Sequence, residues 1–169
     1  ALLDSSILKA YADYYKKFAK TYHVQQQLES VIFKGKSIPT VAGLVEAMFM
    51  AELKNGLLTA GHDFQTLQLP LTLDAVSQDE QYVLMNGKEQ AVKPGDMRIS
   101  DTSGVISSII HGPDQRTRIT TDTQKVVYVV YAPPGITHKL VLQHLSDIHR
   151  YVKLFAPGVQ MLEQLVVSS

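Results

Sequence analysis

The sequence predicts an α+β fold in which mostly antiparallel central sheets are flanked by N- and C-terminal helices. Three observations support this prediction: helical patterns of apolar residues at both ends of the 169-residue chain, short β-branched segments in its middle, and tight-turn sequences between those segments. Strands that follow one another through short turns pair antiparallel, whereas parallel strands need long crossovers. The middle of the chain is therefore expected to be antiparallel rather than regularly alternating α/β.

Residues 4–34 are expected to be helical, either as one helix or as two helices divided near Tyr22–His23, with Ser5 or Ser6 as the N-cap. Apolar residues recur there at spacings of one, three and four and form one stripe: Ile7, Leu8, Tyr11, Tyr15, Phe18 and Tyr22. This many tyrosines also suits a cofactor site, but packing is the expected role. Gly35 is expected to end this segment, and Pro39 precedes a third helix at residues 40–56.

Short strands are expected at about 66–74, 81–85, 96–100, 105–110 and 125–132. Asn86-Gly87 predicts a hairpin, and Gly61-His62-Asp63 is expected to be a turn. Pro133 ends the last strand, a helix follows at 136–156, and a short final helix is expected at 158–167. The chain is thus divided into an N-terminal helical segment, 1–34, and an α+β domain, 35–169, packed together as one globular unit.

Composition limits the classes of partner. Lys+Arg and Asp+Glu number 16 each, so the formal net charge is zero. Because nucleic-acid binders usually carry a basic excess, such a partner is expected to meet a local patch, for example Lys16, Lys17 and Lys20. No apolar run predicts a membrane span or membrane partner, and the first residues predict no secretory signal. Cysteine is absent, and the cytoplasm is the expected compartment.

Motifs for several kinds of chemistry are missing from the sequence. No glycine-rich phosphate loop follows a predicted strand, and no Gly-x-Ser-x-Gly elbow occurs. The six histidines lack metal-ligand spacing. The sequence therefore predicts no metal site and no cofactor.

The most polar segment of the middle region is "HGPDQRTRITTDTQKVVYVV", residues 111–130. If it is extended, Arg116 and Arg118 face one side, with Thr117 and Ile119 on the other. Two guanidinium groups and several hydroxyls can hold a carboxylate, a phosphate or an ester. The alternative is a turn in which the threonines and Asp122 satisfy their own backbone.

Three segments carry a family resemblance: "SIPTVAGLVEAMFMAELKNGLLTAGHD", "YVLMNGKEQAVKPGDMRISDTSGVIS" and "RTRITTDTQKVVYVVYAPPG". In this order they resemble the B3/4 tRNA-editing domain of the phenylalanyl-tRNA synthetase beta chain, and more closely its free-standing relatives. The resemblance spans about residues 30–156. Its most specific part is Arg116-Thr117-x-x-Thr120 followed by Asp122-Thr123.

This resemblance implies a B3/4-like α+β fold, RNA binding, and hydrolysis of the ester of mischarged aminoacyl-tRNA without a cofactor. The implied partners are tRNA or aminoacyl-tRNA and an amino acid or small carboxylate. Ester hydrolysis needs a positioned water and donors for the oxyanion. The expected catalytic residues are His62, His111 and Gln115. The expected substrate-binding residues are Ala60, Asp63, Asp114, Arg116, Thr117, Arg118 and Thr120.

Two departures from the family pattern keep other functions open. Bacterial synthetases place a histidine where this chain has Ala60, and a glutamate where it has Gln115. A non-catalytic RNA-binding or amino-acid-binding module that kept the pocket is therefore the alternative. An enzyme acting on an unrelated small molecule is a third hypothesis, because a fold does not determine a function.

Overall fold

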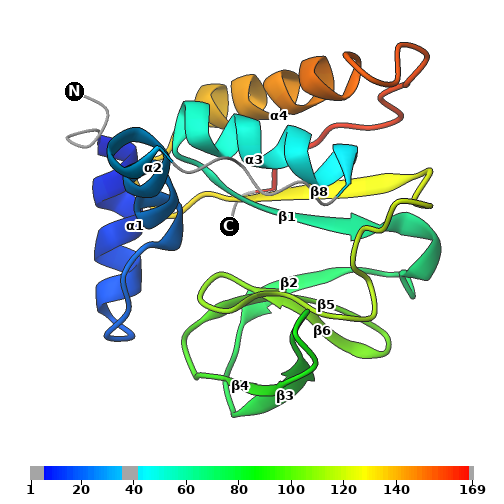
Figure 1. The fold of residues 1–169 in the computed structure, drawn as a ribbon. Helices are drawn as coiled ribbons and strands as arrows, with labels where there is room; N and C mark the ends of the chain where they lie inside the picture. Colours follow the sequence, from blue (N-terminus) through cyan, green and yellow to red (C-terminus); the bar gives the residue numbers. More distant parts are fainter. Residues whose placement is uncertain (1–5, 36–41, 168–169) are drawn as a thin grey trace. The chain divides into compact units, whose positions relative to one another are not determined.

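The computed structural model describes residues 6–35 and 42–167 and has the predicted α+β fold (Figure 1). The chain forms two compact units. Unit 1 comprises the residues up to 58 and from 130 onward, and unit 2 comprises residues 59–129. The helical segment expected at 1–34 belongs to unit 1 together with the C-terminal helix, and its separation from a domain at 35–169 stays a prediction.

Unit 1 contains the four α-helices of the described residues: α1 (Ser6–Lys16), α2 (His23–Lys34), α3 (Gly43–Asn55) and α4 (His138–Val152). The segment expected at 4–34 thus contains two helices, which confirms the alternative of a division near Tyr22–His23 over that of a single helix. α2 ends at Gly35, whose φ of 60° lies in the left-handed region that glycine adopts readily. Figure 1 shows α3 and α4 side by side, and they pack against each other.

Tyrosines of the apolar stripe in unit 1 pack against one another and form hydrogen bonds to backbone groups. The rings of Tyr11 and Tyr22 stack, with centroids 4.3 Å apart and planes 9° apart. The Tyr11 hydroxyl donates to Tyr131 O and accepts from Leu58 N at 3.0 Å. Tyr22 donates to Gly56 O at 3.0 Å. Because both hydroxyls bond backbone in the interior, these tyrosines have the packing role that the helical spacing predicted.

The strands of the described residues form three sheets. In chain order they are β1 (Leu58–Asp63), β2 (Thr72–Ala75), β3 (Glu80–Val83), β4 (Glu89–Val92), β5 (Met97–Asp101), β6 (Gly104–Ser108), β7 (Gly112–Pro113) and β8 (Val126–Tyr131). β1 pairs with β8, and the division between the two units falls inside both strands. A four-stranded sheet has the order β2-β5-β6-β7, and β3 pairs with β4. The pairings within these last two sheets are antiparallel, and the β3–β4 hairpin confirms the Asn86-Gly87 prediction.

Three predicted elements differ from the structure. The strand expected at 66–74 is shorter, because β2 comprises only Thr72–Ala75 and a short 3-10 helix occupies Phe64–Thr66. The expected turn at Gly61-His62-Asp63 is part of strand β1, in which all six residues are buried. Burial on both faces removes the alternation of polar and apolar residues by which a strand is usually recognised. The expected helix at 158–167 is absent, and Leu162 and Leu165 are exposed there. A helix that short is marginal without a packing partner for its apolar side.

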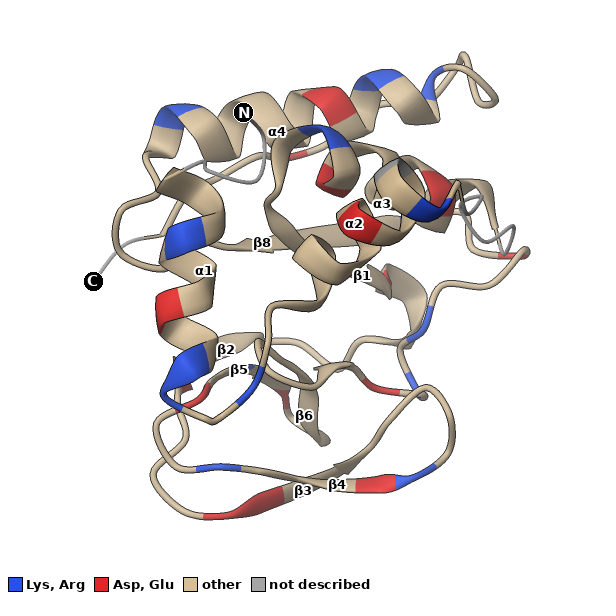
Figure 2. Ribbon diagram, turned by 60° about the vertical axis from the view of Figure 1, so that its left-hand side comes forward, with Lys and Arg blue, Asp and Glu red and all other residues tan. Residues whose placement is uncertain are grey.

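Charged residues are dispersed over the described chain. Figure 2 shows basic and acidic residues on both units, with neither sign confined to one of them. Within the described ranges, every helix is too short or too polar to cross a membrane.

Candidate functional site

The polar loop after β7 is anchored to two strands by its backbone. Asp114 N donates to Ile106 O at 2.8 Å, and Gln115 N donates to Val83 O at 2.9 Å. The Asp114 carboxylate then accepts Thr117 N at 3.1 Å, which closes a turn over residues 115–117. The expectation of an extended segment here is therefore wrong, because a side chain offers the backbone a competing hydrogen bond.

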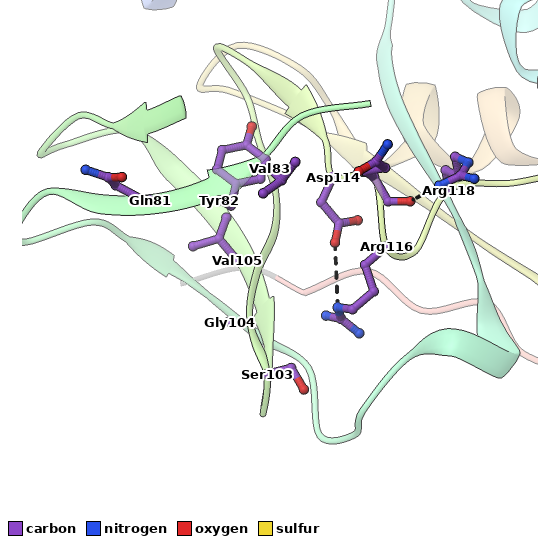
Figure 3. Close-up of a pocket in the computed structure, with 10 residues that line it drawn as sticks. Gln81, Tyr82, Val83, Ser103, Gly104, Val105, Asp114, Arg116 and Arg118 are labelled. Atoms are coloured by element: carbon purple, nitrogen blue, oxygen red, sulfur yellow. Dashed lines mark hydrogen bonds and ion pairs between the residues drawn. The ribbon is translucent and has the colours of Figure 1, made fainter. Parts of the chain in front are cut away.

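A surface hollow of about 390 Å³ lies beside this turn in unit 2 (Figure 3). We call it the unit 2 hollow. It is lined by Gln81, Tyr82, Val83, Ser103, Gly104, Val105, Asp114, Gln115, Arg116 and Arg118. Four of these residues were predicted from the loop sequence, and the other six come from β3, the β5–β6 connection and the start of β6.

Arg116 is tied to a buried carboxylate. Its Nη2 donates to both carboxylate oxygens of Asp101 at 2.8 Å, and its Nη1 donates to Thr66 O at 3.0 Å. The Asp101 side chain is fully buried and also accepts Gln68 N and Ser103 N, each at 2.9 Å. Burial alone would raise the pKa of Asp101, but these hydrogen bonds and the guanidinium charge hold it below its ordinary value. Arg116 thus links its own turn to the segments that carry Thr66 and Asp101.

Arg118 is held more loosely than Arg116. It is exposed, and its Nη1 donates to Gln115 O at 2.8 Å. Within the described part of the chain no acidic side chain forms an ion pair with it. Thr117 and Ile119 are buried, whereas Arg116 and Arg118 line the hollow. The two arginines are therefore separated from Thr117 and Ile119 as predicted, although the segment is a turn.

Beneath the turn, three predicted residues form a buried chain of hydrogen bonds. The Thr117 hydroxyl donates to Asp114 Oδ1, so its oxygen is free to accept the N–H of His62 Nδ1, 2.7 Å away. This tautomer leaves His62 Nε2 as an acceptor, and it has no hydrogen-bond partner among the described residues. Burial, with a smaller effect of the Arg116 charge, lowers the pKa of His62 to about 4. The imidazole is therefore neutral at pH 7, and it does not line the hollow.

The Asp114 carboxylate has a different environment from that of Asp101. Burial raises its pKa, and the two bonds from Thr117 and the charge of Arg116 only partly oppose that rise. The Nε atom of Arg116 is 3.8 Å from Asp114 Oδ2, which is beyond hydrogen-bond range (Figure 3). Asp114 is therefore a buried acid at the wall of the hollow whose charge is incompletely compensated.

Four further predicted residues lie outside the lining of the hollow: Ala60, Asp63, His111 and Thr120. Asp63 Oδ1 accepts Gln65 N at 2.9 Å and its Oδ2 accepts the Thr123 hydroxyl at 2.7 Å, so it shapes the turn after β1. Thr120 is exposed, and its hydroxyl oxygen accepts the backbone N–H two residues later. His111 is half-buried, with its backbone N–H donated to Ser108 Oγ. A role for these four residues in substrate chemistry stays a prediction.

The sequence did not indicate the partner of Arg116 or the apolar residues that line the hollow. Asp101 is 15 residues from Arg116 along the chain, and no local pattern joins the two. Val83 and Val105 belong to different sheets and meet at the hollow only through the tertiary fold. Three or more potential metal ligands do not gather anywhere in residues 6–35 or 42–167.

Comparison with known proteins finds a likeness among solved structures. No family model matches the chain, and no curated protein matches it. Among solved structures, the crystal structure of an N-terminal fragment of the phenylalanyl-tRNA synthetase beta-subunit from Pyrococcus horikoshii is similar, with a TM-score of 0.55 and 18% sequence identity. The match covers 64% of this chain and 38% of that fragment. The resemblance to the synthetase beta chain is therefore supported as a resemblance of fold.

Proposed function

We propose that the unit 2 hollow receives the aminoacyl end of a mischarged tRNA and that the protein hydrolyses its ester as a free-standing editing domain. The observation that supports this proposal is the convergence of Asp114, Gln115, Arg116 and Arg118 on one hollow. They come from the loop that carries the most specific part of the resemblance. The likeness of fold to a synthetase beta-subunit fragment makes an aminoacyl ester the natural substrate to test first.

The lining supplies groups that suit ester hydrolysis. Gln115 has a side-chain amide that can orient a water molecule, and Arg118 has N–H donors for the oxygen that becomes negative. In this reaction the water oxygen bonds to the ester carbon, and its proton passes to solvent through the open hollow. The carbon–oxygen bond to the ribose then breaks, and the ribose oxygen leaves with a proton. The products are the free amino acid and tRNA.

His62 fits this scheme as a positioning residue rather than as the base. Its buried Nδ1 holds Thr117, and Thr117 in turn holds Asp114 at the wall of the hollow. A neutral imidazole with a pKa of about 4 and no place in the lining is poorly suited to accept a proton from a bound water. A catalytic contribution of His111 stays a prediction.

The proposal is tested by deacylation of mischarged aminoacyl-tRNA with the purified full chain. Arg118→Gln is expected to lower the rate about 10- to 100-fold, since one donor to the oxyanion is lost. Lys88→Gln removes the same charge from an exposed turn that does not line the hollow and is the matched control. Failure of the wild-type protein to release any amino acid, or equal rates for the two variants, would contradict hydrolysis in this hollow.

A second candidate, a module that binds an amino acid without hydrolysing its ester, is favoured by one specific observation. The guanidinium of Arg116 is held by Asp101, and His62 is enclosed, so neither is presented to a ligand in the way the family pattern implies. Such a module would show a higher melting temperature with an amino acid present, because a ligand that binds only the folded state stabilises it. Stabilisation by an amino acid without deacylation would favour this candidate over the hydrolase.

A further inference from the structure

We infer that the unit 2 hollow recognises the charge separation of an α-amino acid unit, with the α-ammonium group bound by Asp114 and the carboxylate or ester carbonyl bound by Arg118. This inference rests on the proposed function in taking an aminoacyl group as the ligand. It goes further in two respects. A free amine on the ligand is required, and two named residues bind its ammonium group and its acyl oxygen.

Three charged side chains line the hollow: Asp114, Arg116 and Arg118. Arg116 is paired with Asp101 by two hydrogen bonds of 2.8 Å, so this arginine and that carboxylate neutralise each other. The remaining charged side chains of the lining are Asp114 and Arg118. No ion pair joins these two within the described residues, and in Figure 3 Arg118 points away from the Asp114 carboxylate. The lining therefore presents one negative and one positive group that are separated from each other.

Hydrogen-bonding capacity indicates which end of a ligand each group takes. Asp114 Oδ1 already accepts twice from Thr117, whereas Oδ2 has only the Arg116 Nε at 3.8 Å. A carboxylate oxygen with free lone pairs suits an ammonium group, which has three donors and no acceptor. Arg118 uses Nη1 for Gln115 O and keeps the rest of its fork of donors for a carbonyl or carboxylate oxygen. The site is thus complementary to an ammonium and an acyl oxygen at the same time.

An apolar wall completes the match. Val83 and Val105 line the hollow, together with the ring of Tyr82, whose hydroxyl is already donated to Gly112 O at 2.7 Å. Val83 is 40% exposed, so it offers apolar surface that a ligand can cover. A side chain attached to the carbon between the ammonium and the acyl group would bury apolar surface there. Free anions such as phosphate match only the Arg118 end of this lining.

The test compares two amides with the same carbon skeleton for binding to the ¹⁵N-labelled full chain, with binding followed by the backbone NMR signals of Gly104 and Gln115. L-Phenylalaninamide carries the ammonium, and 3-phenylpropanamide lacks only that group. The wild-type protein is expected to bind L-phenylalaninamide at least about tenfold more tightly, because loss of a desolvated charge pair has an effect of this order or larger. Asp114→Asn is expected to abolish the preference. Asp122→Asn, an exposed acid of the same loop outside the lining, is expected to retain it.

The outcomes separate this inference from the proposed hydrolysis. Equal affinity for the two amides, binding of neither, or a preference that survives in Asp114→Asn would overturn ammonium recognition. If Asp114→Asn does not fold, the comparison of the two amides on the wild-type protein decides alone. Equal deacylation of mischarged tRNA with a free amine and with an N-acetylated amine would retain the hydrolase and reject the role of Asp114. Ammonium-dependent binding without deacylation would support the inference and contradict the hydrolase.

Discussion

Removal of the Arg116 side chain is expected to destabilise unit 2 far more than removal of the neighbouring Arg118 side chain. Arg116→Ala deletes the two bonds to Asp101 and the bond to Thr66 O, and it leaves a fully buried carboxylate without its cation. Breaking a buried ion pair from one side costs about 3–5 kcal/mol. Because the Arg116 side chain is 40% exposed, solvent already screens part of the interaction.

Asp101 also keeps part of its stabilisation in the variant. The backbone N–H groups of Gln68 and Ser103 still donate to it at 2.9 Å. With both corrections, the expected loss of unfolding free energy for Arg116→Ala is about 2–3 kcal/mol. Arg118→Ala removes one bond to a backbone oxygen from an exposed side chain, and its expected cost is below about 0.5 kcal/mol.

The measurement is urea denaturation of both variants, with Asp101→Asn and the double variant completing a thermodynamic cycle. The folded pKa of Asp101 is depressed, so its stabilisation is present above its unfolded pKa and is lost as the pH falls through the folded value. The difference between wild type and Arg116→Ala should therefore shrink below about pH 4. A cost below about 1 kcal/mol at pH 7, equal costs for the two arginines, or no coupling with Asp101 would refute this account.

Three further predictions follow from the same contacts. Tyr11→Phe removes a hydroxyl that bonds two buried backbone groups and should cost about 1–3 kcal/mol in urea denaturation, and a cost near zero would contradict the anchoring role. Burial depresses the folded pKa of His62 and of His144 to about 4, so the free energy of unfolding should fall as the pH drops from about 6.5 towards 4. Replacing either histidine by Gln should flatten that dependence, and an unchanged slope would reject the depressed pKa of that histidine. Gly87→Ala, at a φ of 80°, should cost about 1–2 kcal/mol in thermal or urea denaturation, and a cost near zero would contradict the left-handed conformation of this turn residue.

The helices of the fold were predictable because local patterns specify them. The apolar stripe of α1 and α2 is visible in the sequence, and Gly35 marks the end of α2. β1 was not predictable, because its polar residues are buried by tertiary partners: His62 by Thr117, and Asp63 by Thr123. The final predicted helix failed for the converse reason, since a helical pattern without a packing surface does not stabilise a helix.

The candidate site shows the same limit at the level of single side chains. A spacing of two residues identified Arg116 and Arg118 as a pair, and both do line the unit 2 hollow. Spacing alone gave them equivalent roles. The structure separates the roles through Asp101, whose position depends on the β5–β6 pairing and on no feature of the loop sequence.

The different roles of Arg116 and Arg118 limit what the shared motif implies about chemistry. In Arg116-Thr117-x-x-Thr120, each polar side chain is bonded within the fold: the first to Asp101, the second to Asp114, and the third to the backbone two residues later. A relative that retained these residues would retain the shape of the loop, whatever the reaction. The groups that remain for a ligand are the Oδ2 of Asp114, the amide of Gln115 and the donors of Arg118, and two of these three residues lie outside the motif. Substitutions of Gln115 and Arg118 should therefore change ligand choice while the loop keeps its conformation. Asp114 also holds Thr117 through its Oδ1, so its substitution, like substitutions within the motif, should lower stability as well.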